Sequence, residues 1–160
     1  MLSRTSLMSL EEYAKRRPSF RDEVMEHKKV RKIHLGEHVT LLFEDALTVQ
    51  YQVQEMLRIE RIFEEEAIDE ELHAYLPLVP DGSNWKATPL IEYPDEAERK
   101  VALPKLVDLE DRVYVRVPGF QMVFPHADED CDRENGEKIL SVNFLRVEFT
   151  SDMKKSQLHG

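Results

Sequence analysis

The sequence predicts an α+β fold, with early helices packed on a mostly antiparallel sheet of about five strands. Two observations lead to this prediction. In the first half of the chain, apolar residues recur at spacings of three and four, which is the pattern of amphipathic helices. In the second half, short alternating runs are separated by Gly and Pro, which is typical of antiparallel strands joined by turns.

A chain of 160 residues is expected to form one domain. Neither an internal repeat nor an interdomain linker is evident in the sequence. The segment from Ser151 is polar, and polar chain ends are often frayed. We therefore expect a single α+β domain over residues 1–150, followed by a flexible C-terminal tail over residues 151–160.

Local signals mark where the helices begin and end. Residues Ser9–Glu12 form a capping-box pattern that opens a first short helix, which Pro18 is expected to end or bend. Asp45 is the expected N-cap of the longest helix, and Pro77 stops the helix that follows it. The further helices are expected at about residues 19–32, 46–65, 69–76 and 95–106.

The expected strands are short and separated by turn residues. Pro118-Gly119 is typical of a hairpin turn between two of them. Pro89 lies inside another strand, and proline favours an edge position because it has no N–H to donate. The strands are expected at about residues 38–44, 86–93, 112–117, 121–126 and 139–149.

The composition narrows the range of functions. A net charge of −10 disfavours nucleic acid as a partner, because an acidic protein repels phosphate groups at long range. No apolar run approaches the ~18 residues of a membrane span, and the N-terminus lacks the apolar centre of a signal peptide, so a cytoplasmic protein is expected. The single cysteine excludes an intramolecular disulfide and an iron–sulfur cluster held by this chain alone.

Some motif-like patterns do not meet the requirements of their chemistry. Residues 34–38 have the spelling of a zinc protease, but Gly36 and the strand that follows separate the two histidines. Residues 70–73 match one half of a di-iron site, which needs a second copy and long helices. The acidic run at residues 128–132 lacks the glycine and glutamate of a calcium loop. No cofactor is therefore expected in this chain.

Glu60 is a candidate for a buried acid. It lies between Met56 and Phe63 in the apolar stripe expected for the longest helix. A carboxylate in that place must be paired, hydrogen-bonded or protonated, because an isolated buried charge is very costly. We expect Glu60 to be largely buried and paired with an Arg, Lys or His. A structural ion pair is the favoured interpretation, and a tuned acid, base or metal ligand is the alternative.

The segment from residue 81 to 86 is expected to be an ordered loop at a binding surface. Its Asp-Gly turn precedes the binding candidates Asn84, Trp85 and Lys86. Tryptophan is enriched at interface hot spots, and Lys86 could meet an acidic partner. The alternative, which carries equal weight, is that Trp85 fills the core beneath the loop.

A second set of binding candidates lies on one of the later strands. Alternation places Arg112, Tyr114 and Arg116 on one face of that strand. It places Lys86, Thr88 and Glu92 on one face of another strand. If the two faces coincide, they present cationic and aromatic groups to an anion or to an acidic protein surface. If each face meets solvent separately, it serves solubility alone.

His38, Glu44 and Asp45 are weak candidates for a metal site. His38 and Glu44 share a strand face, and Asp45 caps the next helix, so the three side chains could gather around a divalent cation. They could also connect a loop to a helix, which is the favoured interpretation. No metal is assigned to them.

Three segments carry a resemblance to a known family, namely residues 38–45, 50–58 and 81–95. On these segments the sequence resembles a small, uncharacterised bacterial family of domains of unknown function. Genes of this family often lie beside those of a rubrerythrin-like protein and of an iron–sulfur oxidoreductase related to heterodisulfide reductase. The resemblance implies a partner in redox or peroxide-stress electron transfer, and it supplies no catalytic residues.

Two functional hypotheses follow. The first is an accessory interaction protein of a bacterial redox or oxidative-stress system, with no redox cofactor of its own. Its partner would be an iron–sulfur oxidoreductase or a rubrerythrin-like protein. The second is a metal-dependent or small-molecule-binding enzyme centred on His38, Glu44 and Asp45. Association into a homodimer is compatible with both hypotheses.

Overall fold

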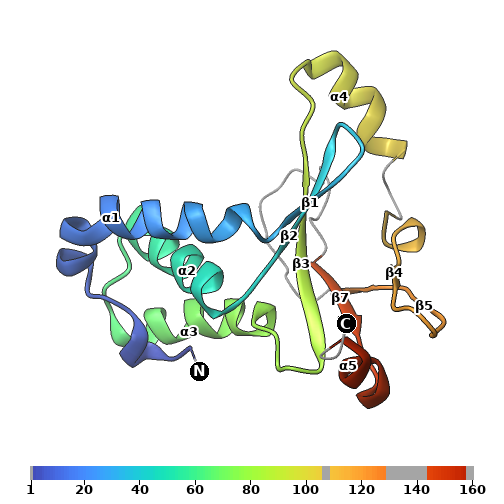
Figure 1. Ribbon diagram of the computed structural model, residues 1–160. Helices are drawn as coiled ribbons and strands as arrows, with labels where there is room; N and C mark the ends of the chain where they lie inside the picture. Colours follow the sequence, from blue (N-terminus) through green and yellow to red (C-terminus); the bar gives the residue numbers. More distant parts are fainter. Residues whose placement is uncertain (1, 106–108, 129–143, 158–160) are drawn as a thin grey trace. The chain divides into compact units, whose positions relative to one another are not determined.

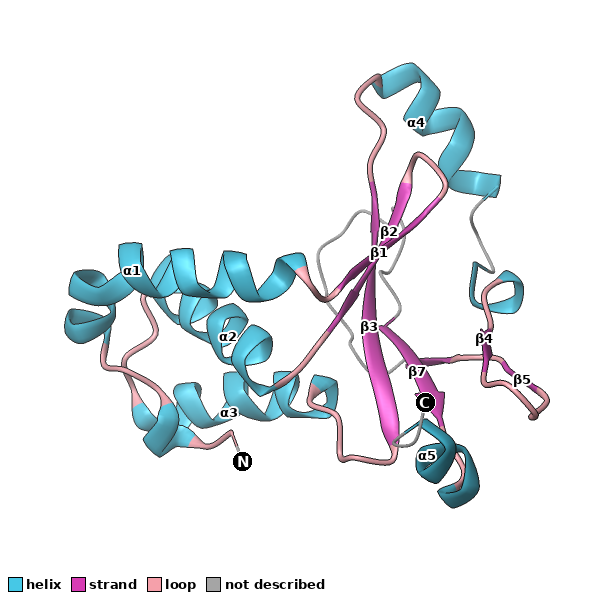
Figure 2. Cartoon of the chain, viewed as in Figure 1, coloured by secondary structure: helices cyan, strands magenta, loops and turns pink. Residues whose placement is uncertain are grey.

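The computed structural model describes residues 2–105, 109–128 and 144–157 (Figure 1). The fold is α+β, as predicted (Figure 2). The longer helices lie early in the chain, and the antiparallel sheet combines strands from residues 32–43 with later strands. The chain forms two compact units, Met1–Lys32 with Glu44–Pro80, and Ile33–Phe43 with Asp81–Gly160. Within the described ranges, no helix combines the length and the apolar character that a membrane span requires. A single domain over residues 1–150 stays a prediction.

The first unit is helical. In the described residues it consists of α1 (Leu10–Lys29), α2 (Ala46–Glu60) and α3 (Glu65–Tyr75), with short 3₁₀ turns at Arg4–Ser6 and Leu76–Leu78. α1 packs against α2, and α2 packs against α3. The core of this unit contains a row of aromatic rings, in which the ring centroids of Tyr13 and Phe20 are 6.2 Å apart and those of Phe20 and Tyr51 are 6.1 Å apart.

α1 continues through Pro18, so this residue does not end the helix, and of the two predicted effects a bend stays a prediction. A proline inside a helix costs about 3 kcal/mol, because it removes a hydrogen bond and crowds the preceding turn. Tyr13 precedes Pro18, whereas Phe20 and Val24 follow it, and all three side chains are buried in the same core. Their burial offsets the cost of the proline, and the two predicted helices form one.

α2 begins where the sequence predicts and ends earlier. The Asp45 carboxylate accepts hydrogen bonds from the backbone N–H groups of Leu47 and Thr48, as an N-cap does. Arg61 adopts a left-handed conformation, with φ of 55°, and ends the helix after Glu60. The helix therefore does not extend to residue 65, where α3 already begins.

Glu60 is exposed, so the prediction that it is buried is wrong. The apolar stripe of α2 is buried at Val53 and Leu57, but it is not covered at the end of the helix. Ile59 and Phe63 on either side of Glu60 are 60% and 70% exposed. The spacing of the apolar residues is helical, but the packing that would bury Glu60 ends one turn before it.

The second unit contains a sheet with the strand order β1-β2-β3-β7-β6. β2 and β3, β3 and β7, and β6 and β7 pair in antiparallel register. The helix predicted over residues 19–32 ends earlier, at Lys29, and β1, which was not predicted, begins at Lys32. Residues 139–143 of the last predicted strand lie outside the described residues. The strands are β1 (Lys32–Leu35), β2 (Val39–Phe43), β3 (Asn84–Ile91), β6 (His126–Asp128) and β7 (Phe144–Glu148).

Two predicted strands form a hairpin outside this sheet. They are shorter than predicted, as β4 (Val115–Arg116) and β5 (Met122–Val123), and they pair only with each other in the described residues. The predicted turn at Pro118-Gly119 is confirmed, because Phe120 N–H donates a 3.0 Å hydrogen bond to the carbonyl of Val117. Gly119 supplies the positive φ of 86° that this turn requires.

Pro89 lies in a strand that has a partner on each side, so the predicted edge position is wrong. It is opposite Leu41 of β2. On the other side, the described register with β7 covers Asn84–Ala87 and ends before Pro89. The missing N–H of proline therefore falls in a part of β3 that β7 does not reach within the described residues.

α5 (Ser151–Gln157) occupies most of the segment that was predicted to be a flexible tail, so that prediction is wrong for these residues. Its Met153 is 7% exposed and packs with Val117, Val147 and Phe149 in one apolar cluster. A polar segment can be ordered by a single apolar side chain when a neighbouring core accepts it. The predicted helix near residues 95–106 is present as α4 (Glu96–Ala102), followed by a 3₁₀ turn at Leu103–Lys105.

The hairpin and α5 cover one face of the sheet. Val115 and Val123 of the hairpin pack on the cluster that contains Met153. A second cluster on the same sheet consists of Leu41, Ala87 and Leu145, with Val113 packed against it. Every second residue from 113 to 117 thus points to the sheet, and the residues between them are left at the surface.

Met153→Ala should lower the free energy of unfolding by about 2–3 kcal/mol, because the substitution leaves a cavity among buried side chains. Lys155→Ala changes an exposed residue of the same helix and should stay within about 0.5 kcal/mol of the wild type. Denaturant unfolding followed by circular dichroism measures both. Equal stability of the two variants would show that Met153 adds nothing to the core.

Candidate functional site

The binding candidates Asn84, Trp85 and Lys86 begin strand β3, so the expected loop is a short turn followed by a strand. In this turn, the Asp81 carboxylate accepts hydrogen bonds from the hydroxyl and the N–H of Ser83, at 2.6 and 2.7 Å. These bonds hold the pKa of Asp81 below its usual range. The segment is ordered, but the strand dictates where its side chains point.

Trp85 is half-buried in a row of aromatic side chains. Its ring centroid lies 5.4 Å from that of Phe43 and 4.7 Å from that of Phe149, and both contacts are edge-on. The Trp85 side chain is 39% exposed, whereas its strand neighbours Asn84 and Lys86 are 7% and 6% exposed. Trp85 therefore contributes to packing and keeps a surface for a partner, so both predicted roles stay open.

The candidates Arg112, Tyr114 and Arg116 are all exposed. Lys86 belongs to the large sheet, whereas Arg116 belongs to β4 in the separate hairpin. The two faces therefore do not coincide, so of the two alternatives the joint cationic face is not formed. Arg112, Tyr114 and Arg116 belong to a different surface.

The hairpin has an outer face of its own. Val115 packs toward the core, whereas Arg116 and Met122 lie opposite each other on the two strands. Tyr114 and Phe124 extend the same side, with ring centroids 5.9 Å apart. The side chains of Tyr114, Met122 and Phe124 are 48%, 48% and 50% exposed. We call the set Tyr114, Arg116, Met122 and Phe124 the outer hairpin face.

The weak metal candidates each have other partners. His38 Nδ1 lies 3.0 Å from the carbonyl oxygen of Glu92, and Glu44 accepts a 2.5 Å hydrogen bond from the Thr48 hydroxyl. His38 belongs to the second unit, whereas Glu44 and Asp45 belong to the first. In the part of the chain that the structure describes, no group of three or more His, Cys, Asp or Glu side chains could hold a metal ion.

Asp45 is the centre of an ion-pair cluster in the first unit. One carboxylate oxygen accepts the N-cap hydrogen bonds of α2, and the other lies 2.7 Å from both His27 Nε2 and Arg31 Nη2. Burial alone would raise the pKa of Asp45, but the Thr48 N–H, His27 and Arg31 outweigh it and hold the pKa below its usual range. The cluster joins the end of α1 to the start of α2.

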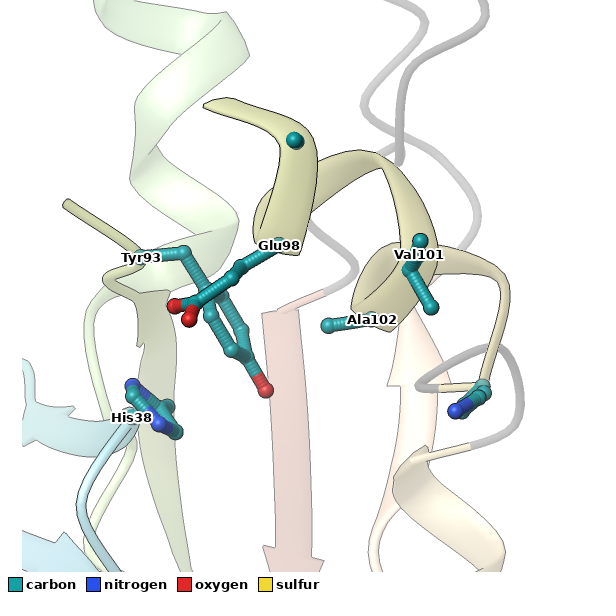
Figure 3. A pocket seen from close by; sticks show the side chains of 7 residues that line it. His38, Tyr93, Glu98, Val101 and Ala102 are labelled. Carbon is teal, nitrogen blue, oxygen red and sulfur yellow. The ribbon is translucent and has the colours of Figure 1, made fainter. Parts of the chain in front are cut away.

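His38 lines an open groove with a volume of about 640 Å³ (Figure 3). Its imidazole stacks on the ring of Tyr93, with centroids 4.1 Å apart and planes inclined by 16°. Among the lining residues, only His38 was predicted as a site residue from the sequence. The groove is lined by His38, Tyr93, Ala97, Glu98, Val101, Ala102 and Lys105.

A largely buried acid does exist in α2, at Glu55. Its carboxylate accepts two hydrogen bonds from Arg17, at 2.7 and 2.9 Å, and a 2.5 Å hydrogen bond from the hydroxyl of Tyr13. The bonds from Arg17 lower the pKa of Glu55 to about 2, although burial opposes them. Burial and the bond to Glu55 raise the pKa of Tyr13. The available sequence signal is the spacing of Tyr13 and Arg17, one helical turn apart on one face.

A family model described as "Protein of unknown function (DUF3501)" matches residues 1–160. The chain belongs to this family. It is also similar to a crystal structure of a novel protein of unknown function from Burkholderia pseudomallei, with 47% sequence identity and a TM-score of 0.86. That similarity covers 99% of this chain and 82% of the other. A comparison with curated proteins finds no match. The resemblance to an uncharacterised family is thus confirmed, and the neighbouring genes that it implies stay a prediction.

Glu55→Gln should lower the free energy of unfolding at neutral pH by about 1–3 kcal/mol, because it weakens the charge-assisted bonds to Arg17 and Tyr13. Glu60→Gln is the matched control, since it changes an exposed acid of the same helix and should cost less than about 0.5 kcal/mol. Denaturant unfolding at pH 7 measures the difference between the two variants.

The pH dependence of stability tests the same buried acid. The pKa of Glu55 is about 2 in the folded protein and close to 4.5 when the residue is unperturbed, so the unfolded chain binds more protons between these values. The stabilisation by Glu55 is therefore complete above about pH 4.5 and is lost as the pH falls toward 2. Glu55→Gln should flatten this part of the curve of stability against pH. If stability falls as steeply with acid in Glu55→Gln as in Glu60→Gln, Glu55 is not the group whose pKa is lowered.

Proposed function

We propose that this protein is an accessory interaction protein of a bacterial redox or oxidative-stress system that docks on an acidic partner protein through the outer hairpin face. One observation carries the proposal. The hairpin buries one side against the sheet, yet it leaves Tyr114, Met122 and Phe124 about half exposed on the other side. Neighbouring large apolar side chains at the surface of a well-packed element are a recognised mark of interaction sites.

The residue types of this face support a protein partner. Tyrosine, phenylalanine, methionine and arginine are the residue types enriched in the centres of protein interfaces. The rings of Tyr114 and Phe124 lie side by side, and the partly buried Val115 and Val123 hold the other side of the hairpin against a core cluster. Binding would therefore order few additional groups, which keeps the entropic cost of association low.

The charge of this face supports an acidic partner. Arg116 of this face and Arg112, which lies two residues before Tyr114 in the sequence, are exposed, and neither takes part in an ion pair among the described residues. The chain as a whole carries a net charge of −10, so these two cations stand out locally from an acidic protein. Carboxylates on the partner would pair with them and increase the rate of association.

The redox part of the proposal rests on the resemblance to the family. In this role the partner is an iron–sulfur oxidoreductase or a rubrerythrin-like protein in the cytoplasm, and the partner carries the electrons. This chain supplies the binding surface. The alternative of an enzyme centred on His38, Glu44 and Asp45 has less support, because Glu44 and Asp45 take part in contacts at the start of α2.

Binding to purified candidate partners tests the proposal. The rubrerythrin-like protein and the iron–sulfur oxidoreductase of the same bacterium are titrated with the full chain by calorimetry. The double variant Tyr114→Ser, Phe124→Ser should weaken binding at least about tenfold, because it removes the apolar centre of the face. Arg116→Glu should also weaken binding, more strongly at low salt than at high salt.

Ile59→Ser is the matched control, since it changes an apolar side chain that is 60% exposed on α2 and should leave binding unchanged. Failure of both candidate partners to bind would overturn the redox assignment. Binding that the hairpin variants do not change would overturn the docking face. A dimer of this chain that the hairpin variants dissociate would replace the foreign partner by a second copy.

Trp85→Ala separates the two roles of the indole. The substitution removes edge-on contacts to Phe43 and Phe149, so a loss of about 2–4 kcal/mol in stability is expected if packing is its main role. Weaker partner binding with an unchanged melting temperature would assign Trp85 to recognition. Thermal unfolding and the same titrations give both readouts.

A further inference from the structure

The groove at His38 is an open depression that is large enough for a small molecule. Its volume of about 640 Å³ lies within the range of ~300–1,000 Å³ that is typical of ligand sites. His38 and Tyr93 flank one side of the open space, and Val101 and Ala102 flank the other (Figure 3). The Tyr93 hydroxyl points into the space between His38 and Ala102 (Figure 3).

Hydrogen bonds hold the His38 ring in place. The backbone carbonyl of His38 accepts a 2.9 Å hydrogen bond from Glu92 N–H. The ring Nδ1 of His38 lies 3.0 Å from the Glu92 carbonyl oxygen. Because a carbonyl oxygen can only accept, Nδ1 carries the proton in this contact. In the neutral ring, Nε2 is then an acceptor for a ligand. The stacked ring of Tyr93 fixes the plane of the imidazole.

The opposite wall carries two charges on one helical face. Glu98, Ala102 and Lys105 follow each other at spacings of four and three, which places them in a row along α4 and the 3₁₀ turn after it. A separation of seven residues corresponds to roughly 10 Å along a helix axis. The small side chain of Ala102 leaves room between the carboxylate and the ammonium group.

Glu98 and Lys105 have no ion-pair partner in the part of the chain that the structure describes. By contrast, the neighbouring Lys100 pairs with Glu96 at 2.8 Å. Near one end of the groove, the Glu98 carboxylate can accept hydrogen bonds from N–H groups of a ligand. Near the other end, Lys105 supplies a positive charge, and the flat rings of His38 and Tyr93 lie beside them. This combination fits one kind of ligand.

We propose that the groove binds a small molecule made of a planar aromatic ring with N–H donors and a separate anionic group. The ring would lie against the His38–Tyr93 pair, its N–H groups would donate to Glu98 or to His38 Nε2, and the anionic group would pair with Lys105. A mononucleotide and free tryptophan share this chemistry. The site is distinct from the outer hairpin face, and it does not depend on the proposed partner.

Titration of the full chain by calorimetry and ligand-observed NMR distinguishes the two sources. Adenosine monophosphate represents the nucleotide, and L-tryptophan represents the amino acid. Adenosine lacks the anionic group, and inorganic phosphate lacks the ring. We expect one of the first two probes to bind at least about tenfold more tightly than adenosine and phosphate. Binding of the nucleotide alone or of the amino acid alone supports the proposal and names the source.

Two variants test the residues that the proposal uses. Lys105→Met removes the cation, and Tyr93→Leu removes the stacked ring; each should weaken binding about tenfold. Lys100→Met is the matched control, because Lys100 lies on the same helix and pairs with Glu96, and it should bind as the wild type does. Thermal unfolding confirms that each variant is folded. If Tyr93→Leu does not fold, the comparison of Lys105→Met with Lys100→Met decides the question.

The proposal is overturned if neither adenosine monophosphate nor L-tryptophan binds at millimolar concentration, or if Lys105→Met and Lys100→Met bind equally well. If adenosine monophosphate binds, an equal affinity for adenosine would also overturn the role of Lys105. The double variant Tyr114→Ser, Phe124→Ser should leave this binding unchanged. A failure of the groove and a failure of the hairpin face are therefore separate results.

Discussion

The antiparallel register of β3 between β2 and β7 is the constraint on which both candidate surfaces depend. This register places Ala87 opposite Phe43 of β2 and Leu145 of β7. The apolar cluster of Ala87, Leu41 and Leu145 accepts Val113 from the segment that leads into the hairpin. Since that segment alternates, its buried valines dictate that Tyr114 faces outward. At the other end of β3, the backbone of Glu92 binds His38 and so sets the stack that lines the groove.

Much of the fold could be predicted because its signals are local. The cap at Asp45 and the turn at Pro118-Gly119 depend on a few adjacent residues, and both are found where they were expected. The errors occur where distant packing outweighs a local preference. Pro18 favours a break, but burial on both sides of it keeps α1 continuous. Met153 orders a polar segment because a cluster built from other parts of the sequence accepts it.

The candidate sites were harder to predict, because each depends on contacts between distant segments. The helical period indicates that α2 has a buried side, but it does not show how far along the helix the packing extends. Glu60 is exposed for this reason, and Glu55 is the acid that Arg17 and Tyr13 bind. Gln54 is fully buried because it binds the backbone of Met8, a partner that the spacing of residues does not reveal. His38 was predicted, but its partners across the groove belong to a helix much later in the chain.

The ion-pair cluster at Asp45 holds together the two points at which residues 33–43 leave and re-enter the helical unit. The chain leaves the first unit after Lys32 and returns to it at Glu44, and the 2.7 Å contact between Arg31 and Asp45 brings these two points together. Residues 33–43 therefore have the connectivity of an insert in a helical host. A few flexible residues would bridge the same gap at a small cost in loop entropy. The helical host is thus a starting point for a miniature scaffold, in which the insert is exchanged without altering the helices.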